Sequence, residues 1–258
     1  MQVISVVNHK GGAAKTTTCV NLAAALVELN RRVLVIDLDP QASASLWLGV
    51  RTKGQEFLKA VMEGKDLDKL VQETSSGLHL VPCGPAFASF EKLAANQKGS
   101  EMYLKQAMST LPDSWDYAFL DCPPSLNLTS VNALVASTRA LAPVTAQVLS
   151  LEPLARLLDT MWQVRESLNP ELQFNGMFAT RVDNRTAHGP EVVRLLREQF
   201  GDNVYSISIR ENVQLAEAAG FQKPVNQYAP SSNGAEDYRA LAKEFEHRLK
   251  KELAKQEV

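Results

Sequence analysis

A short apolar segment followed by a glycine-rich turn and a helical pattern constrains the fold of this chain more than any other feature. Residues 3–7 are apolar and β-branched, as expected for a buried strand. Residues 16–30 carry apolar side chains at helical spacing, and residues 32–37 form a second apolar run without alternation. A strand, a helix and a strand in this order predict a right-handed crossover within a parallel sheet.

The same rhythm continues along the chain and predicts a doubly wound α/β fold, with a mostly parallel β-sheet flanked by helices. No linker rich in Pro, Gly or Ser and no internal repeat divides the sequence, so we expect one domain over residues 1–258. A bend or helix interruption is expected at residues 96–100. Further strands are expected at residues 78–81, 117–120, 140–144, 174–179 and 204–207, and helices at residues 87–111, 151–168, 190–200 and 235–255.

Composition excludes several classes of protein. With 45% hydrophobic and 22% charged residues, the chain resembles neither a disordered nor a membrane protein. The net charge of −2 means that any binding to nucleic acid needs a local basic patch. No signal peptide is recognisable, and no apolar run approaches the ~18 residues of a membrane-spanning helix, so a cytoplasmic protein is expected.

Three cysteines, Cys19, Cys83 and Cys122, are widely separated and odd in number. They match neither a disulfide framework nor the spacing of metal ligands. We expect reduced, buried side chains that behave as small hydrophobes.

The turn between the first strand and the first helix, residues 9–17, reads His-Lys-Gly-Gly-Ala-Ala-Lys-Thr-Thr. In this position backbone amides can converge on phosphate oxygens, Lys15 can reach the β- and γ-phosphates, and Thr16 can offer its hydroxyl to magnesium. The strict phosphate-loop pattern asks for glycine where this chain has His9 and Ala14, so a glycine-rich turn without nucleotide is the alternative.

Three segments of the chain resemble the ParA/MinD family of P-loop ATPases. Residues 10–17 are similar to the family's deviant Walker A motif, in which an extra lysine, here Lys10, precedes the glycines. Residues 37–41, Asp-Leu-Asp-Pro-Gln, resemble switch I, and residues 119–125 resemble Walker B and switch II. Weaker similarity covers nearly the whole chain. The early position of the loop resembles the short, Soj-like ParA proteins, with no room for an N-terminal helix-turn-helix domain.

The resemblance implies an ATPase that dimerises on binding Mg-ATP, binds DNA nonspecifically and is reset by slow hydrolysis, which a ParB-like activator stimulates. It implies a role in DNA partitioning or cargo positioning and a cytoplasmic, nucleoid-associated location. A MinD-like membrane-associated ATPase is one alternative. A nucleotide-binding scaffold with little turnover is another, which Ala14 permits because its methyl group lies close to the phosphates. A redox protein like the nitrogenase iron protein would need a second cysteine beside Cys122, and none stands at a comparable loop.

The resemblance also implies roles for individual residues. Lys15 is the charge for the phosphates, Asp39 orients the attacking water, and Lys10 reaches the partner's nucleotide across the dimer. Asp37 is expected to be structural, and adenine contacts are expected from residues 180–184 and 209–212. The expected catalytic residues are Lys10, Lys15 and Asp39; those binding ATP are Lys10, Gly11, Gly12, Ala13, Ala14, Lys15, Thr16, Thr17 and Asp121; and those serving Mg²⁺ are Thr16, Asp39 and Asp121.

Two features bear on what the ATPase acts on. An apolar stripe on the last helix is narrow and has mixed charged neighbours, which favours packing on its own domain over a membrane anchor. Relatives often read Pro-Arg-Asn-Val-Arg where residues 210–214 read Arg-Glu-Asn-Val-Gln, so a substitute DNA-binding patch or a scatter of solvated charges remains open. The stripe is Leu241, Phe245, Leu249 and Leu253, and the candidate DNA-binding residues are Arg181, Arg185, Arg210, Lys223, Arg239 and Lys243, with Arg194 and Arg197 nearby.

Overall fold

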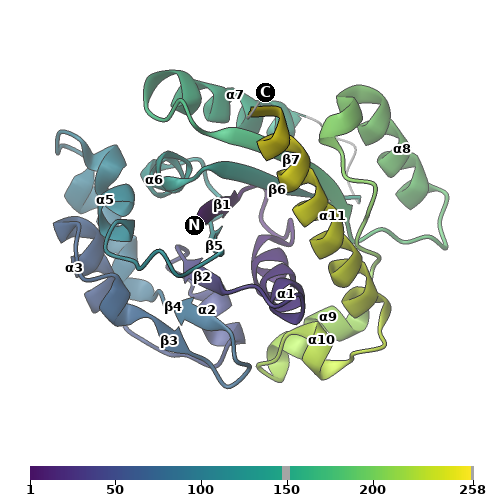
Figure 1. Cartoon of the computed structure of the whole chain (residues 1–258), viewed down its shortest axis with the longest axis horizontal. Coiled ribbons are helices and arrows are strands. Elements are labelled where there is room, and N and C mark those ends of the chain that lie inside the picture. Colours follow the sequence, from purple (N-terminus) through teal and green to yellow (C-terminus); the bar gives the residue numbers. More distant parts are fainter. Residues whose placement is uncertain (147–151, 257–258) are drawn as a thin grey trace.

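A twisted, mostly parallel sheet forms the centre of the computed structural model, which describes residues 1–146 and 152–256 (Figure 1). Its strand order is β3-β4-β2-β5-β1-β6-β7, and only the β3–β4 pair is antiparallel. The predicted doubly wound fold is therefore confirmed. The strands are β1 Gln2–Val6, β2 Val33–Asp37, β3 Gln72–Glu73, β4 His79–Val81, β5 Tyr117–Asp121, β6 Arg139–Thr145 and β7 Gln173–Thr180.

Helices cover both faces of this sheet (Figure 1). α1 and α11 pack against each other on one face, and α3, α5, α6 and α7 lie on the opposite face. The helices are α1 Lys15–Glu28, α2 Ser43–Trp47, α3 Gln55–Glu63, α4 Phe90–Ala94, α5 Tyr103–Met108, α6 Leu128–Ala136, α7 Glu152–Ser167, α8 His188–Phe200, α9 Val213–Gly220, α10 Val225–Tyr228 and α11 Asn233–Gln256.

Two hydrophobic cores result, one on each face, because successive strand side chains point to opposite sides of the sheet. On β5, Ala118 and Leu120 join the core beneath α3, α5, α6 and α7, whereas Phe119 joins the core beneath α1 and α11. All three cysteines are free and buried, as predicted. The continuous apolar runs in the sequence are explained by this two-sided burial.

The strand expected at residues 204–207 is wrong. Val204 makes a single isolated bridge to β7, and the chain then leaves the sheet. The carboxylate of Glu244 on α11 accepts the amides of Ser206 at 2.8 Å and Ile207 at 3.0 Å. Those amides therefore bond to a helix side chain instead of to a strand, which no local pattern in the sequence indicates.

The helical stretch expected over residues 87–111 is present but is not continuous. It is divided into a 3-10 turn at Pro85–Ser89, α4, a second 3-10 turn at Ser100–Met102, and α5. Gly99 ends the intervening loop with φ +79, a conformation that glycine adopts without steric penalty. The interruption predicted at residues 96–100 is thus confirmed, while α2, α3, α6, α9 and α10 were not predicted.

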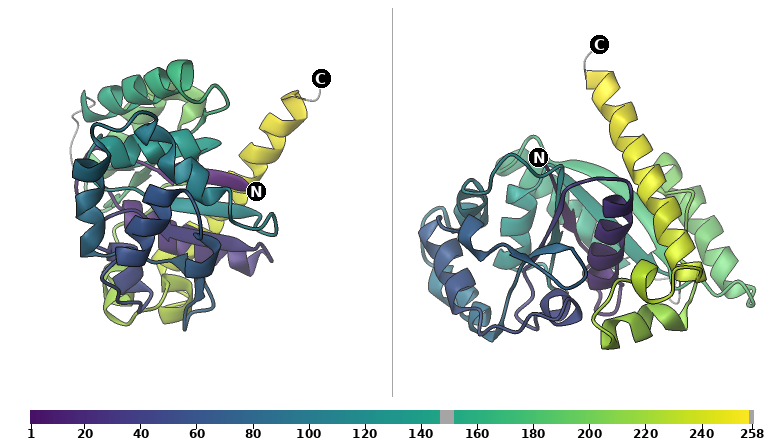
Figure 2. Two further views of the ribbon diagram at one scale, coloured as in Figure 1. Left: turned by 90° about the vertical axis from the view of Figure 1, so that its left-hand side faces the viewer. Right: turned by 60° about the horizontal axis from the view of Figure 1, so that its bottom comes forward.

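The apolar stripe of α11 packs on the sheet and on α1. Leu241 and Phe245 are fully buried, and Leu249 is 3% exposed. The side chain of Leu253 and residue Leu151, the expected start of the helix that forms α7, lie outside the described residues. The ribbon of α11 continues past the body of the molecule toward the C-terminus (Figure 2). Within residues 1–146 and 152–256, no helix has the length and apolar character needed to cross a membrane.

Candidate nucleotide-binding site

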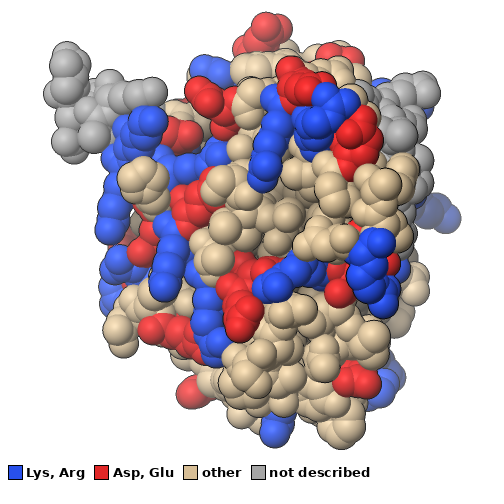
Figure 3. Space-filling view, turned by 90° about the vertical axis from the view of Figure 1, so that its right-hand side faces the viewer, with Lys and Arg blue, Asp and Glu red and all other residues tan. Residues whose placement is uncertain are grey.

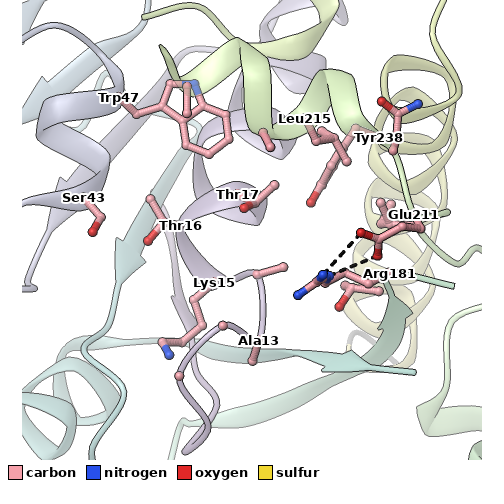
Figure 4. Close-up of a pocket in the computed structure, with 18 of the residues that line it drawn as sticks. Ala13, Lys15, Thr16, Thr17, Ser43, Trp47, Arg181, Glu211, Leu215 and Tyr238 are labelled. Carbon is pink, nitrogen blue, oxygen red and sulfur yellow. Dashed lines mark hydrogen bonds and ion pairs between the residues drawn. The ribbon is translucent and has the colours of Figure 1, made fainter. Parts of the chain in front are cut away.

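A cavity of about 490 Å³ opens at the carboxyl ends of the parallel strands, where open α/β sheets bind ligands. The phosphate-loop residues 11–17 form one wall, and the loop after β7 forms the facing wall (Figure 4). Trp47, Leu215 and Tyr238 close one end with apolar surface. The sequence segments predicted to bind nucleotide therefore meet around one cavity.

The phosphate loop has the backbone shape of an anion cradle. Gly12 and Ala14 both lie in the left-handed region, at φ +74 and +64. Ala14 is the N-cap of α1 and provides no side-chain hydrogen bond to the first turn of the helix. The amides of that turn are therefore available to an anion, which the positive end of the helix dipole also favours.

Lys15 points its ammonium back into this loop. The residue is only 7% exposed, and Nζ donates to the backbone carbonyls of Asn8 at 3.2 Å and Lys10 at 3.4 Å. Burial lowers the pKa of Lys15, although the carboxylates of Asp121 and Asp39 oppose this shift. A buried ammonium with only carbonyl partners is suited to an incoming phosphate, which supplies the missing negative charge.

Asp121 faces Thr16 at the mouth of the same loop. The Thr16 hydroxyl donates to Asp121 Oδ2 at 2.7 Å, and Cys19 Sγ lies 3.8 Å from Oδ1. Burial, together with the neighbouring carboxylate of Asp37, raises the pKa of Asp121 well above its usual range. A divalent cation beside Thr16 would reverse that shift, because it would favour the charged carboxylate.

Within the described parts of the chain, no group of three or more His, Cys, Asp or Glu side chains could hold a metal ion. Magnesium at a nucleotide site is usually bound through one or two protein oxygens, water molecules and the phosphates. The Thr16 hydroxyl, with the Asp121 carboxylate beside it, is compatible with such a site, in which one protein oxygen binds the ion and a carboxylate accepts from a bound water.

Asp39 and Lys10 differ in their relation to the cavity. Asp39 lines it, and its Oδ1 accepts the amide of Gln41 at 2.9 Å. Lys10 is exposed, and its amide donates to Asn8 Oδ1 at 2.9 Å. Its reach toward a second protomer stays a prediction.

At the end of the cavity predicted to hold adenine, two buried polar atoms, Thr180 Oγ1 and Asn212 Oδ1, have no hydrogen-bond partner among the residues that the structure describes. Thr180 is only 1% exposed, so its hydroxyl would gain from a polar ligand. The adjacent Arg181 donates from Nε to Glu211 at 3.0 Å (Figure 4) and adopts φ +56, a strained backbone for arginine.

Comparison with known proteins identifies the family of this chain. A family profile described as an AAA domain matches residues 1–174. The chromosome-partitioning ATPase Soj of Thermus thermophilus is 40% identical over 246 residues, covering 95% of this chain and 96% of that protein. The sporulation initiation inhibitor protein Soj of Bacillus subtilis is 37% identical, covering 94% of this chain and 97% of that protein. The chain belongs to the ParA/MinD family of P-loop ATPases.

Solved structures share the fold of this chain. Cobyrinic acid a,c-diamide synthase of Mycobacterium smegmatis, solved with ADP and magnesium, has a TM-score of 0.82 and 29% identity, covering 94% of this chain and 93% of that chain. The septum site-determining protein MinD of Pyrococcus horikoshii, complexed with Mg-ADP, has a TM-score of 0.75 and 24% identity, covering 94% of this chain and 95% of that chain. The latter likeness supports the fold.

Some residues of this ParA/MinD-type cavity were missed by sequence reasoning. Leu215 and Tyr238 lie in segments of weak family similarity, but nothing in their spacing indicates contact with a ligand. No motif in the sequence indicated Trp47, because its place on the cavity wall depends on how α2 packs against the rest of the molecule. Asn8, which supports the phosphate loop from outside the cavity lining, was also missed; its side-chain amide donates to the Pro143 carbonyl near the end of β6 at 2.7 Å.

The candidate DNA-binding residues of this ParA/MinD member do not form a free basic patch. Among the described residues, all four arginines of that set form ion pairs with carboxylates, whereas Lys223 and Lys243 are exposed and form none. Basic and acidic side chains alternate over the face that includes α8 and α11 (Figure 3). The pairs are Arg181 with Glu211, Arg185 with Asp183, Arg210 with Asp237 and Glu236, and Arg239 with Glu28; Arg194, nearby, pairs with Glu191 and Glu198.

Proposed function

We propose that this protein is a ParA-type positioning ATPase that dimerises on Mg-ATP, binds DNA nonspecifically and is reset by hydrolysis. The observation that carries the proposal is the buried Lys15 ammonium, which has only carbonyl partners and lies beside the uncapped first turn of α1. The identity of 37–40% to Soj proteins over nearly the whole chain supports it further. We take residues 1–258 to act as one ATPase domain.

The proposed chemistry depends on position and charge, because phosphoryl transfer needs little covalent help from the protein. Amides of residues 11–17 would cradle the phosphates, and Lys15 would neutralise charge on them. A magnesium ion held beside Thr16 would supply positive charge that offsets the negative charge developing on the phosphates. Thr16 would be its direct ligand and Asp121 the partner of its water.

Two further roles belong to the hydrolysis step. Asp39 would orient the attacking water, and Lys10 would complete the site of a second protomer. Turnover is proposed to be slow and to be stimulated by a ParB-like activator, in the cytoplasm at the nucleoid.

Few of the candidate DNA-binding cations are free to contact a phosphate, because most of them pair with carboxylates. Lys223 and Lys243 are the candidate phosphate contacts without carboxylate partners in the described part of the chain. A dimer would double their number and so bring more cations to one duplex. We therefore expect weak, sequence-independent binding that falls steeply with salt.

A nucleotide-binding experiment tests the proposal at its first step. Lys15→Ala should abolish calorimetrically detectable binding of Mg-ATP, because no other buried cation in the described cavity faces the phosphate loop. Lys59→Ala, an exposed lysine on α3, is the matched control and should bind like the parent. Equal ATP affinity in Lys15→Ala and the parent would refute the phosphate loop. ATP binding without steady-state hydrolysis would favour a scaffold.

A further inference from the structure

Asp37 lies at the end of β2 with its side chain completely buried. Both of its carboxylate oxygens are used within the chain. Oδ1 accepts the amide of Asp39 at 3.0 Å, and Oδ2 accepts the amide of Ser45 at 2.9 Å and its hydroxyl at 2.7 Å. One buried carboxylate therefore holds both ends of the loop that contains Asp39.

The loop between these two ends is closed by its own hydrogen bonds. Asp39 Oδ1 accepts the amide of Gln41 at 2.9 Å, and the Asp39 carbonyl accepts the amide of Ala42 at 2.7 Å. Ala42 adopts φ +56 and turns the chain directly into α2. With its ends held by Asp37, this loop has a single compact shape that places the Asp39 carboxylate on the cavity wall.

Asp37 and Ser45 together form a clamp on the loop that contains Asp39, and Ser45 links this clamp to a second strand. Its Oγ donates to Asp37 and accepts the amide of Cys83 at 3.0 Å, just beyond the end of β4. The Ser45 side chain is completely buried, so removing its hydroxyl would leave polar groups on both sides without a partner. The ends of β2 and β4 and the start of α2 are thereby joined through one hydroxyl and one carboxylate.

We propose that Asp37, acting with Ser45, is a positioning residue for ATP hydrolysis that sets the Asp39 carboxylate relative to the phosphate loop. This inference rests on the proposed ATPase function. Neither Asp37 nor Ser45 lines the nucleotide cavity, whereas Asp39 does. The pair therefore acts on the reaction through Asp39.

The geometry requires a carboxylate at position 37. Asp37 accepts on both oxygens, and among the described residues the Asp39 amide donates to no other acceptor. In Asp37→Asn one oxygen becomes an NH₂ group, which cannot accept an amide hydrogen. Whichever way the amide side chain is oriented, one end of the loop is released. In Ser45→Ala the hydroxyl is lost, although the Ser45 amide can still bond to Asp37.

The test compares turnover with nucleotide affinity in these two variants. Asp37→Asn and Ser45→Ala should lower kcat by about 10- to 100-fold, because small misplacements of a water-orienting group are sufficient for such losses. Their affinity for ATP should stay within about threefold of the parent, since the phosphate loop is unchanged. Ser45→Thr keeps the hydroxyl and should recover most of the turnover. Cys83→Ala, buried beside the clamp but contributing only its backbone amide, is the matched control and should hydrolyse ATP like the parent.

A double-mutant cycle separates positioning from general destabilisation. If Asp37 acts through Asp39, adding Asp37→Asn to Asp39→Ala should change kcat by less than about threefold, far below its effect in the parent. Additive losses, or a parallel loss of ATP affinity, would overturn the inference. If the parent hydrolyses ATP and both variants keep its kcat, the inference about Asp37 and Ser45 is overturned and the proposed function stands. If the parent does not hydrolyse ATP, the proposed function is overturned together with this inference.

Discussion

Ala14 is the residue whose backbone conformation most directly affects the proposed nucleotide site. Its φ of +64 lies in the left-handed region, where an L-residue with a Cβ is disfavoured by about 1–2 kcal/mol. Ala14→Gly removes that strain but increases the freedom of the unfolded chain, so we expect a gain of roughly 0.5–1 kcal/mol in the free energy of unfolding, measured with urea. ATP affinity should rise in parallel if the strained loop opposes nucleotide binding.

Ala13→Gly is the control for this prediction. Ala13 lies in the same loop without a positive φ, so the substitution increases unfolded-state freedom and relieves nothing. It should lower stability by about 0.5–1 kcal/mol. Destabilisation of similar size in both variants would show that strain at Ala14 is unimportant.

Lys10 provides a second prediction at the scale of the residue. Its side chain is exposed and does not line the described cavity, while its backbone carbonyl accepts from Lys15. Lys10→Ala should therefore keep most of the ATP affinity of the monomer but lose ATP-dependent dimerisation or turnover, measured by light scattering and phosphate release. A variant that lost ATP binding altogether would indicate that Lys10 acts within its own protomer.

At the scale of the element, α11 is held by carboxylates whose pKa values are lowered in the folded protein. Hydrogen bonds from Arg239 lower the pKa of Glu28, and those from Arg31 lower the pKa of Glu246. Burial opposes the shift at Glu244, but hydrogen bonds from Ser206, Ile207 and Arg248 outweigh it and leave the pKa below its ordinary value. The helix is thus joined to α1, to Arg31 just after α1 and to the segment that leaves the sheet.

These shifts predict how stability depends on pH. A carboxylate with a lowered folded pKa stabilises the protein fully above its unfolded pKa of about 4.3 and loses that contribution as pH falls through the folded value. The free energy of unfolding should therefore decrease below about pH 5. Glu244→Gln should lose about 1–3 kcal/mol at pH 7 and show a shallower decrease in acid, measured by urea unfolding at pH 7 and pH 4. Parallel curves for the variant and the parent would contradict the assigned role of Glu244.

At the scale of the whole molecule, the mixed charge distribution governs the proposed DNA binding. Gln214 is an exposed residue near the start of α9, in the segment where the family resemblance leads us to expect arginine. Gln214→Arg should strengthen ATP-dependent binding of random duplex DNA, and the slope of log affinity against log salt should steepen by about 2 for the two copies in a dimer. Fluorescence anisotropy with labelled duplexes, with ATP and with ADP, measures both quantities.

Gln163→Arg, on the exposed face of α7, adds the same charge elsewhere and is the matched control. An equal gain in both variants would indicate a general effect of net charge. No ATP-dependent binding at any salt concentration would remove DNA as the partner and leave the ATPase proposal standing.

Local sequence was sufficient to predict much of the fold and the phosphate end of the site. Runs of apolar residues buried on both sides, as in β2 and β5, are recognisable because every side chain in them avoids water. The turn from residue 10 to residue 17 is recognisable because its glycines permit a tight turn and its lysine and threonine follow at the spacing expected of a phosphate loop. Lys15 and Thr16 of that turn line the cavity, and so does Asp39, which was expected there only from the resemblance of residues 37–41 to switch I.

Tertiary structure alone decided the features that depend on partners distant in the sequence. Glu244 removes residues 206–207 from the sheet across an interval of almost forty positions, Trp47 reaches the cavity through the packing of α2, and Glu211 neutralises Arg181. The sequence by itself determined the central strands β1, β2, β5 and β6 and the glycine-rich turn proposed to hold phosphate, because short-range burial and backbone preferences specify them. Long-range packing determined the partners of the amides, aromatic rings and charged groups that lie outside those segments.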